Sequence, residues 1–313
     1  MKALVTGGAG FIGSNLARAL VLRGDEVRVL DNFSTGNRRN LVELGDEIEV
    51  VEGELRSYER VHAATRGVEV VFHQGALPSV PRSVQDPLTT GAVNVEGTLN
   101  VLLAARDQGV RRVVFASSSS VYGNSGELPR LETANPDPIS PYGVSKLAAE
   151  RYCVSFSRVY ALETVALRYF NVFGPNQDPT SQYSAVIPLF VTAIARGEPI
   201  AIYGDGNQRR DFTYVDNVVD ANLVAAEVEG ANGLVLNVAT GRSTSVNELA
   251  TVIGQLLDRP VGRDEHPPRA GDVRDSWADI ARAEQVLGWK PRVSLEDGLA
   301  LAAEAFIGTT RAD

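Results

Sequence analysis

The stretch KALVTGGAGFIG, residues 2–13, decides the fold. The segment KALVT reads as a buried strand, and Gly7, Gly10 and Gly13 follow it with the spacing G-x-x-G-x-x-G. A helical pattern then runs over roughly residues 12–23. Small residues let a turn approach a diphosphate, and the start of a helix offers free N–H groups at the positive end of its dipole. A glycine turn between a strand and a helix therefore predicts a dinucleotide-binding site.

The next predicted strand, residues 26–31, ends in a carboxylate. Asp31 at that point accepts hydrogen bonds from both ribose hydroxyls of NAD and repels the 2′-phosphate of NADP. The alternative is a plain glycine-rich turn beside an unrelated surface aspartate. The position of Asp31 at a strand end favours NAD.

Further along the chain, short β-branched runs alternate with helical patterns. Continuous apolar strands between helices are typical of a parallel sheet covered on both faces, and right-handed crossovers make it doubly wound. The predicted fold class is therefore α/β, a Rossmann-type doubly wound parallel sheet. The predicted strands are residues 48–53, 68–74, 111–117 and 163–171, and the predicted helices lie around residues 93–108 and from Pro141 onward.

The pattern changes after about residue 172, where prolines and glycines interrupt it. Residues 201–215 read as strand, turn and strand, and residues 234–241 as a strand that returns to the main sheet. Ser245 and Glu248 form a capping box at the start of a helix over residues 245–257. We predict an NAD-binding domain of residues 1–172 plus about 213–241. A discontinuous, smaller α/β substrate-binding domain takes about 173–212 and 242–313.

Composition excludes several classes of function. The 313 residues are 44% hydrophobic and 22% charged, with a formal net charge of −9, which disfavours general binding to nucleic acid or anionic membranes. A single cysteine, Cys153, and three scattered histidines exclude an intrachain disulfide and leave no metal-ligand spacing. No signal-peptide pattern and no apolar run of membrane length is visible, so we expect a cytoplasmic protein.

The run VVFASSSSVYG, residues 113–123, is an apolar strand that ends in four serines. Downstream, PYGVSK places Tyr142 and Lys146 at i and i+4, on one face of the predicted helix. A phenol is a poor base at neutral pH, but a nearby ammonium favours the phenolate. A tyrosine base, a lysine and a serine hydroxyl beside a nicotinamide suit the oxidation of a carbinol. Alone, Tyr-x-x-x-Lys is equally typical of an amphipathic helix surface.

Together these motifs resemble the extended short-chain dehydrogenase/reductase family, in particular its nucleotide-sugar epimerases, dehydratases and decarboxylases. The resemblance covers essentially the whole chain. It implies that Tyr142 is the base, Lys146 its partner and Ser118 the catalytic hydroxyl. It also implies an NAD site made of Gly7, Gly10, Phe11, Ile12, Gly13, Asp31, Asn32, Ser34, Thr35, Gly36, Glu54, Leu55, Gln74, Gly75, Ala76, Asn94, Ser117, Tyr142, Lys146 and Phe170.

The same resemblance implies a UDP-sugar substrate, with Arg210 and Arg269 on the diphosphate and Asp272 on the uridine ribose. Guanidinium groups pair with phosphate in bidentate fashion, although each arginine alone reads as a solvated surface charge. The implied substrate residues are Ser79, Arg82, Ser118, Ser119, Tyr142, Asn171, Ala185, Val186, Tyr203, Arg210, Arg269, Asp272 and Ser276.

The residues after Ser118 indicate the branch of the family. Dehydratases and decarboxylases carry acids there, whereas this chain has Ser119 and Ser120, so it lacks the extra base that elimination needs. Inversion at C4 is then the simplest chemistry, and we predict a UDP-sugar 4-epimerase with tightly bound NAD. The rivals are a UDP-glucuronate 4-epimerase or decarboxylase, with Arg82 or Ser79 on the carboxylate, and a non-catalytic NAD-binding regulator.

The residue at position 276 bears on the choice of sugar. In the related epimerases a tyrosine there excludes an acetamido group at C2, and Ser276 leaves room for one. We predict that UDP-GlcNAc and UDP-GalNAc are accepted as well as UDP-glucose and UDP-galactose, unless Ser276 is simply a surface serine. Glu54 and Gly75 depart from the family's usual Asp and Ala and leave NAD affinity open. The resemblance also implies a homodimer, in which the helices that follow NVEGT and PYGVSK pair with their copies.

Overall fold

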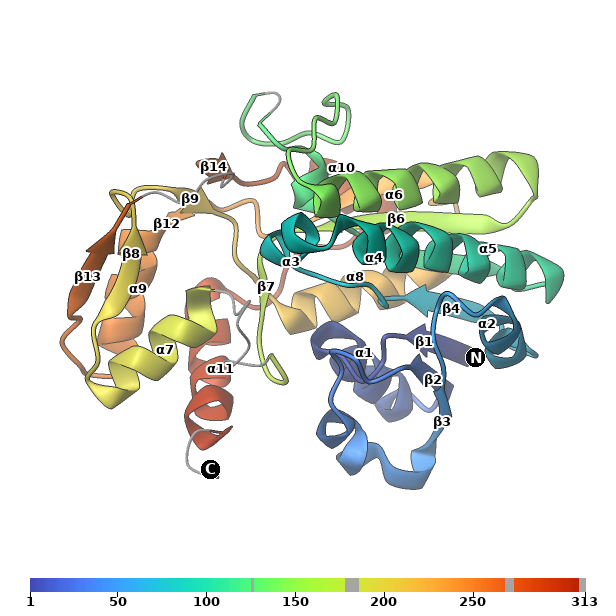
Figure 1. Ribbon diagram of the computed structural model, residues 1–313, viewed down its shortest axis with the longest axis horizontal. Helices are drawn as coiled ribbons and strands as arrows, with labels where there is room; N and C mark the ends of the chain where they lie inside the picture. The colour runs from blue at the N-terminus through green and yellow to red at the C-terminus, as the bar shows by residue number, and fades with distance from the viewer. Residues whose placement is uncertain (125–126, 178–185, 268–272, 310–313) are drawn as a thin grey trace.

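A seven-stranded parallel sheet forms the larger part of the computed structural model, which describes residues 1–124, 127–177, 186–267 and 273–309 (Figure 1). The strand order is β11-β6-β5-β4-β1-β2-β3, the doubly wound arrangement expected from the alternating pattern. Its strands are β1 (Lys2–Thr6), β2 (Glu26–Asp31), β3 (Ile48–Glu52), β4 (Val70–His73), β5 (Arg112–Ser118), β6 (Glu163–Tyr169) and β11 (Leu234–Val238).

Both faces of this sheet are covered by helices, which explains why its strands are apolar throughout. Ala3 and Val5 of β1 face one core cluster, which α1 and α8 also line, and Leu4 between them faces the other, with α2, α5 and α6. The helices of this part are α1 (Phe11–Leu22), α2 (Tyr58–Thr65), α3 (Val80–Gln85), α4 (Pro87–Gly91), α5 (Gly97–Asp107), α6 (Pro141–Val159) and α8 (Val215–Glu227).

The helix predicted around residues 93–108 is not uniform. It begins as a π-helical turn, η2 (Ala92–Glu96), and becomes α5 at Gly97. A π-turn gives no separate periodic signal in a short sequence window, so the apolar pattern could not separate it from an α-helix. The structure has two further short helical segments in this part, η1 (Arg38–Glu47) and η3 (Ser119–Val121).

A smaller group of elements lies at the other side of the molecule in Figure 1. The predicted capping box of α9 is present, with Ser245 and Glu248 satisfying each other's backbone N–H groups. The elements of this group are β7 (Val172–Phe173), α7 (Val186–Arg196), β8 (Ile200–Tyr203), β9 (Arg209–Arg210), β10 (Thr213–Tyr214), β12 (Thr244–Ser245), α9 (Val246–Leu256), β13 (Arg263–His266), β14 (Asp275–Ser276) and α11 (Leu295–Thr309). Helix α10 (Ala281–Leu287) follows β14 in the chain but packs against β11 and α8 of the larger part.

Strand β11 returns to the main sheet, where it pairs with β6 in parallel, as the strand pattern of residues 234–241 predicts. The chain thus leaves the main sheet after β6 and comes back to it. The proposed division into two discontinuous domains remains a prediction.

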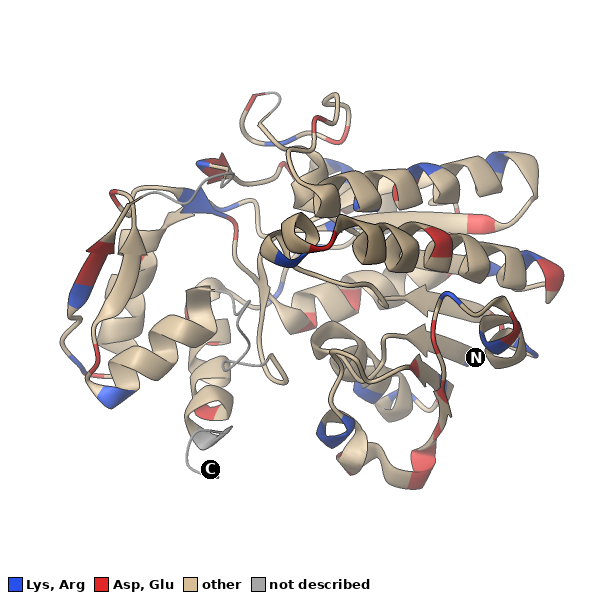
Figure 2. Cartoon of the chain, viewed as in Figure 1, with Lys and Arg blue, Asp and Glu red and all other residues tan. Residues whose placement is uncertain are grey.

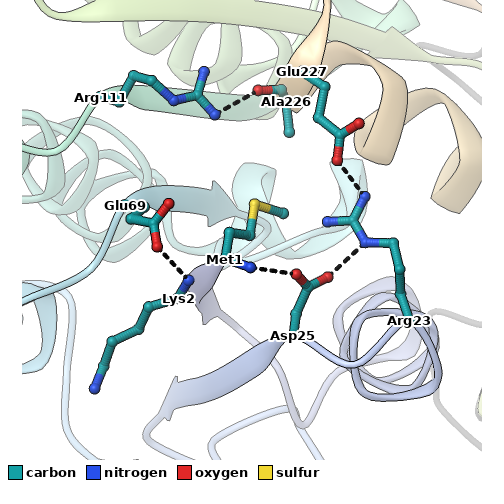
Figure 3. Close-up of polar contacts among 8 residues, drawn as sticks. All are labelled: Met1, Lys2, Arg23, Asp25, Glu69, Arg111, Ala226 and Glu227. Atoms are coloured by element: carbon teal, nitrogen blue, oxygen red, sulfur yellow. Dashed lines mark hydrogen bonds and ion pairs between the residues drawn. The ribbon is translucent and has the colours of Figure 1, made fainter.

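A network of ion pairs lines the edge of the sheet where the strands begin (Figure 3). The Asp25 carboxylate accepts from the Met1 ammonium at 2.7 Å and from Arg23 at 2.6 Å, and Arg23 also pairs with Glu227 at the end of α8. Arg111 donates to the backbone oxygen of Ala226 at 3.0 Å. These contacts attach α8 to the edge of the sheet where the strands begin. They support the sheet from the side opposite the carboxyl ends of its strands.

Charged residues of both signs are interspersed along both parts of the chain (Figure 2). Within the described residues, none of the helices combines the length and the apolar character that a membrane span requires. The same residues contain no group of His, Cys, Asp and Glu side chains placed to hold a metal ion.

Candidate active site

The glycine turn between β1 and α1 has no room for side chains. A Cβ atom on Gly13 would lie 2.2 Å from the Gly7 carbonyl oxygen, and one on Gly7, whose φ is +67°, would lie 2.6 Å from the Cα of Gly75. The Gly10 N–H donates to the Gly7 oxygen at 3.1 Å and closes the turn. The backbone therefore comes close to the end of β4 and leaves the start of α1 open to an anion.

Asp31, at the end of β2, is held rigidly beside this turn. Its two carboxylate oxygens accept from the backbone N–H groups of Ala9 at 2.9 Å and Phe33 at 2.8 Å. The side chain is nearly buried, so the negative charge is fixed next to the place where an adenosine ribose would follow a diphosphate on the glycine turn. This arrangement fits NAD, because a 2′-phosphate would meet the carboxylate.

A cavity of about 240 Å³ joins the turn to the middle of the sheet. It lies at the carboxyl ends of the strands, where open α/β sheets bind their ligands. The sequence-predicted NAD residues that line it are Gly7, Gly10, Phe11, Ile12, Gly13, Asp31, Asn32, Ser34, Thr35, Gly36, Glu54, Leu55, Gln74, Gly75, Ala76, Ser117, Tyr142 and Lys146. The carboxylate of Glu54, the longer acid, pairs with Arg56.

Two predicted NAD residues lie outside this lining. Asn94 is buried behind it, where its Oδ1 accepts from the Leu77 N–H at 2.8 Å and its Nδ2 donates to the Ser145 hydroxyl at 3.0 Å. Phe170 is enclosed in a small core cluster with Tyr122. Both side chains thus support the cavity wall and do not face the cavity.

The cavity also has lining residues that the sequence reasoning missed. Strand ends could have revealed several of them, since Leu30 and Ala116 each precede a predicted site residue and Tyr169 ends β6. The Tyr169 hydroxyl forms a buried cluster with Gln74 and Asn222, which no local spacing announces. The missed residues are Leu30, Gly53, Leu77, Pro78, Val93, Ala116 and Tyr169.

Helix α6 presents Tyr142 and Lys146 to the cavity. Pro141 is its first residue and the Ser140 hydroxyl accepts from the Gly143 N–H at 3.1 Å, so the helix starts immediately before the tyrosine. The Lys146 ammonium donates to the backbone oxygen of Ala116 at 2.9 Å. Burial lowers the pKa of Lys146 to about 8. Because this value is still above neutral pH, the ammonium remains cationic there.

The Tyr142 phenol faces Ser118 at the end of β5. Burial raises the pKa of Tyr142, and a hydrogen bond with the Ser118 hydroxyl acts in the opposite direction. Ser118 itself accepts from the N–H and the hydroxyl of Ser120, at 3.2 and 2.9 Å. Strand β5 therefore ends in serines because two hydroxyls organise a turn that aims Ser118 at the phenol. A cation next to the phenol is needed to make it a base at neutral pH.

A second cavity, of about 450 Å³, is lined by residues between Asn171 and Val246, most of them on the smaller group of elements. Four predicted substrate residues line it, namely Asn171, Val186, Tyr203 and Arg210. The Asn171 side-chain amide donates to the backbone oxygen of Asp211 at 3.1 Å, and the Arg210 guanidinium donates to the backbone oxygen of Arg274 at 2.7 Å. Much of the remaining wall is apolar, formed by Phe173, Ile187, Leu189, Phe190, Ala193, Ile200, Phe212 and Val246.

The other predicted substrate residues occupy three places. Ser276 stands opposite Arg210 in the pairing of β9 with β14. Ser79, whose φ is +96°, begins α3, and its hydroxyl accepts from the Arg82 N–H at 3.3 Å. Ser119 starts the turn after β5. Ala185, Arg269 and Asp272 lie outside the described residues.

The family model described as the NAD dependent epimerase/dehydratase family matches residues 3–239. The chain belongs to this family. A UDP-glucose 4-epimerase of Mycolicibacterium smegmatis is 41% identical to it over 315 residues, which cover 98% of each chain. This member of the family therefore matches a curated relative over almost its whole length.

Solved structures of the family resemble it equally well. A UDP-glucose 4-epimerase of Thermotoga maritima, determined with UDP-glucose, has a TM-score of 0.94 and 40% identity, covering 99% of this chain and 100% of that one. A UDP-N-acetylglucosamine 4-epimerase of Methanobrevibacter ruminantium, in complex with UDP-N-acetylmuramic acid, has a TM-score of 0.94 and 38% identity, covering 98% of each chain.

NAD is the cofactor of this family. A UDP-glucose 4-epimerase of Thermus thermophilus, in complex with NAD, has a TM-score of 0.89 and 37% identity, covering 98% of this chain and 99% of that one. The glycine turn that a Cβ atom would fill and the buried carboxylate of Asp31 fit this cofactor. The expected Rossmann-type fold and the expected family are thus both confirmed.

Proposed function

We propose that this chain is a UDP-sugar 4-epimerase with tightly bound NAD. It accepts UDP-GlcNAc and UDP-GalNAc as well as UDP-glucose and UDP-galactose. One observation carries the proposal: Tyr142 and Lys146 line the same cavity as the glycine turn and Asp31, and Ser118 faces Tyr142. A proton acceptor for a sugar hydroxyl thus lies beside the site that fits NAD.

The chain's own residues handle the proton. Tyr142 takes the proton of the sugar 4-OH directly or through the Ser118 hydroxyl. We assign stabilisation of the phenolate to the Lys146 ammonium, which lines the same cavity. When bound, NAD supplies a reversible hydride acceptor for C4. Burial raises the pKa of Tyr142, so the nearby positive charges decide whether it works as a base.

Inversion requires that the 4-keto sugar present both of its faces while its nucleotide stays bound. We assign Arg210 to binding the diphosphate, because Arg210 lines the second cavity and a guanidinium can donate two parallel hydrogen bonds to a phosphate. The apolar wall around Phe190 and Phe212 suits a flat uracil ring, with Tyr203 and Asn171 beside it. A firmly held nucleotide and a loosely held sugar permit rotation about the phosphate linkage.

The proposed acceptance of N-acetylated UDP-sugars in addition to plain ones rests on Ser276. Its pairing with Arg210 puts it next to the assigned diphosphate residue and hence near the sugar. A serine there occupies less space than the phenol that excludes an acetamido group, and a small residue admits without demanding. Plain hexoses therefore remain substrates.

The test is a product assay on purified protein without added NAD. UDP-GlcNAc, UDP-glucose and UDP-glucuronate are offered separately, and the C4 epimers are resolved by NMR. Conversion of both UDP-GlcNAc and UDP-glucose supports the proposal. Conversion of UDP-glucose alone removes the argument from Ser276, conversion of UDP-glucuronate alone replaces the substrate, and no conversion leaves a non-catalytic NAD-binding protein.

We also propose a homodimer that buries the outer face of α4, α5 and α6. Large apolar side chains are exposed there, among them Leu88 at 85%, Val144 at 52% and Val159 at 65%. Sedimentation velocity tests this arrangement. A dimer that Val144→Glu dissociates supports it, and a wild-type monomer contradicts it.

A further inference from the structure

A fully buried asparagine on β11 joins three segments near the sugar side of the site. The Oδ1 of Asn237 accepts from the Tyr122 hydroxyl at 2.6 Å. Its Nδ2 donates to the backbone oxygens of Arg130 at 2.9 Å and Asp279 at 3.1 Å. Both atoms of the side-chain amide are thus used, and each bond reaches a residue far away in the sequence.

One of these segments carries the reacting hydroxyl. Tyr122 closes the short turn that begins after Ser118, so its phenol connects that turn to Asn237. The other two segments are joined to each other, because the Arg130 N–H donates to the Trp277 oxygen at 2.8 Å and the Asp279 N–H donates to the Arg130 oxygen at 3.0 Å. Trp277 directly follows Ser276.

The Ser276 segment is held from its other side by Asp211, which is also fully buried. The Asp211 N–H donates to the backbone oxygen of Ser276 at 3.0 Å, and the Asp211 carboxylate accepts from the Ala278 N–H at 3.4 Å. Asp211 follows Arg210 in the chain, so it sets the place of Ser276 relative to the diphosphate side. Asn237 sets the place of Ser276 relative to the turn of Ser118.

We propose that Asn237 is a positioning residue that sets the spacing between the Ser118 turn and the Ser276 segment, and thereby the affinity for N-acetylated relative to plain UDP-sugars. The inference rests on the proposed function. An acetamido group at C2 reaches the Ser276 segment, whereas a hydroxyl at C2 is too short to depend on it. Loosening the segment therefore weakens binding of the N-acetylated sugar more than binding of the plain one.

Two variants test this reasoning at different links. Asn237→Asp keeps the acceptor for Tyr122 but loses both donors. Tyr122→Phe keeps the ring and removes the phenolic hydroxyl, together with its hydrogen bonds to Asn237 and Arg168. Asn217→Asp is the matched control. Asn217 is a second buried asparagine, on α8, and its Nδ2 donates to the Val293 oxygen at 2.8 Å, away from both cavities.

The readout is calorimetric binding of UDP, UDP-GlcNAc and UDP-glucose to each holoenzyme, together with kcat/KM for the two sugars. In both variants the affinity for UDP-GlcNAc falls about tenfold and that for UDP-glucose less than about threefold, while the affinity for UDP stays unchanged. In the Asn217→Asp control all three affinities equal those of the wild type.

The inference is overturned by equal weakening of binding of both sugars, or by the same change of affinity ratio in the Asn217→Asp control. Wild-type protein that does not bind UDP-GlcNAc overturns it as well. Absence of turnover by the wild type refutes the proposed function instead, because the binding ratio needs no reaction. If Asn237→Asp does not fold, Tyr122→Phe decides alone, since it removes one oxygen atom.

Discussion

His73 predicts a specific dependence of stability on pH. It ends β4 below the glycine turn and is 1% exposed, and its Nδ1 and Nε2 lie 2.6 Å from the Thr6 hydroxyl and 3.0 Å from the Thr98 hydroxyl. The Thr98 hydroxyl donates its proton to the backbone oxygen of Asn94, so it must accept from the Nε2–H of His73. The Nδ1 of His73 is then an acceptor. Burial, and to a lesser extent the charge of Lys146, lowers the pKa of His73 to about 3.

The sign and size of the effect follow from this pKa. An unfolded histidine has a pKa of about 6.5, so below that pH the unfolded chain binds a proton that folded His73 does not. The contribution of His73 to the free energy of unfolding is fully present above pH 6.5. It falls by about 1.4 kcal/mol per pH unit as the pH drops toward 3. Between pH 7.5 and 4.5 the free energy of unfolding thus loses about 2.5 kcal/mol through this residue alone.

Urea unfolding at pH 7.5, 6.0 and 4.5 measures this loss in the wild type and in His73→Gln. His62→Gln is the control, because it removes a half-buried imidazole from α2 and leaves the site intact. The variant His73→Gln loses stability at every pH, but its slope with pH is shallower than that of the other two proteins. The titrating groups other than His73 are common to wild type and His73→Gln and cancel between them, and the control shows the effect of removing a different imidazole. Parallel curves for wild type and His73→Gln would refute the reasoning.

Three further predictions concern the cofactor site and the ion pair behind it. Tyr142→Phe lowers kcat by about 10³-fold while NAD still copurifies with the protein, since only the proton acceptor is removed; normal turnover would show that the base is elsewhere. Asp31→Asn narrows the discrimination between NAD and NADP about tenfold in binding titrations, because the repulsive charge is lost. Glu150→Gln lowers the free energy of unfolding by about 3–5 kcal/mol, because the guanidinium of Arg168, 2.7 Å away and equally buried, loses its counter-charge; thermal unfolding near wild type would contradict this.

The sequence predicted those parts of the site whose chemistry depends on neighbours in the chain. Gly7 and Gly13 share one turn, and Tyr142 and Lys146 share one helix face, so their spacing alone places them. Asp31 follows from the rule that strands of a parallel sheet end at the same edge. Each of these inferences needs only local structure and one general rule of topology.

The residues that hold these groups in place could not be predicted in the same way. Asn237, Asp211 and Asn222 are buried amides or acids whose partners lie tens of residues away in the sequence. In a list of residues, each looks like an ordinary polar position inside a strand, loop or helix. Their meaning appears only when the fold brings their partners to them, because burial without a hydrogen bond would cost more than the residue contributes.

This difference explains why the sequence points more directly to the proposed reaction than to the choice of sugar. The proposed proton acceptor and the cofactor turn are each built on a single element, whereas the proposed sugar site lies between Ser118 on the main sheet and Ser276 on the smaller part. The space between them is set by a chain of buried contacts through Tyr122, Asn237 and Arg130. Under the proposed function, a serine at position 276 admits an acetamido group only if these contacts hold the segment at the right distance. We therefore assign the choice of sugar to the contacts as much as to Ser276.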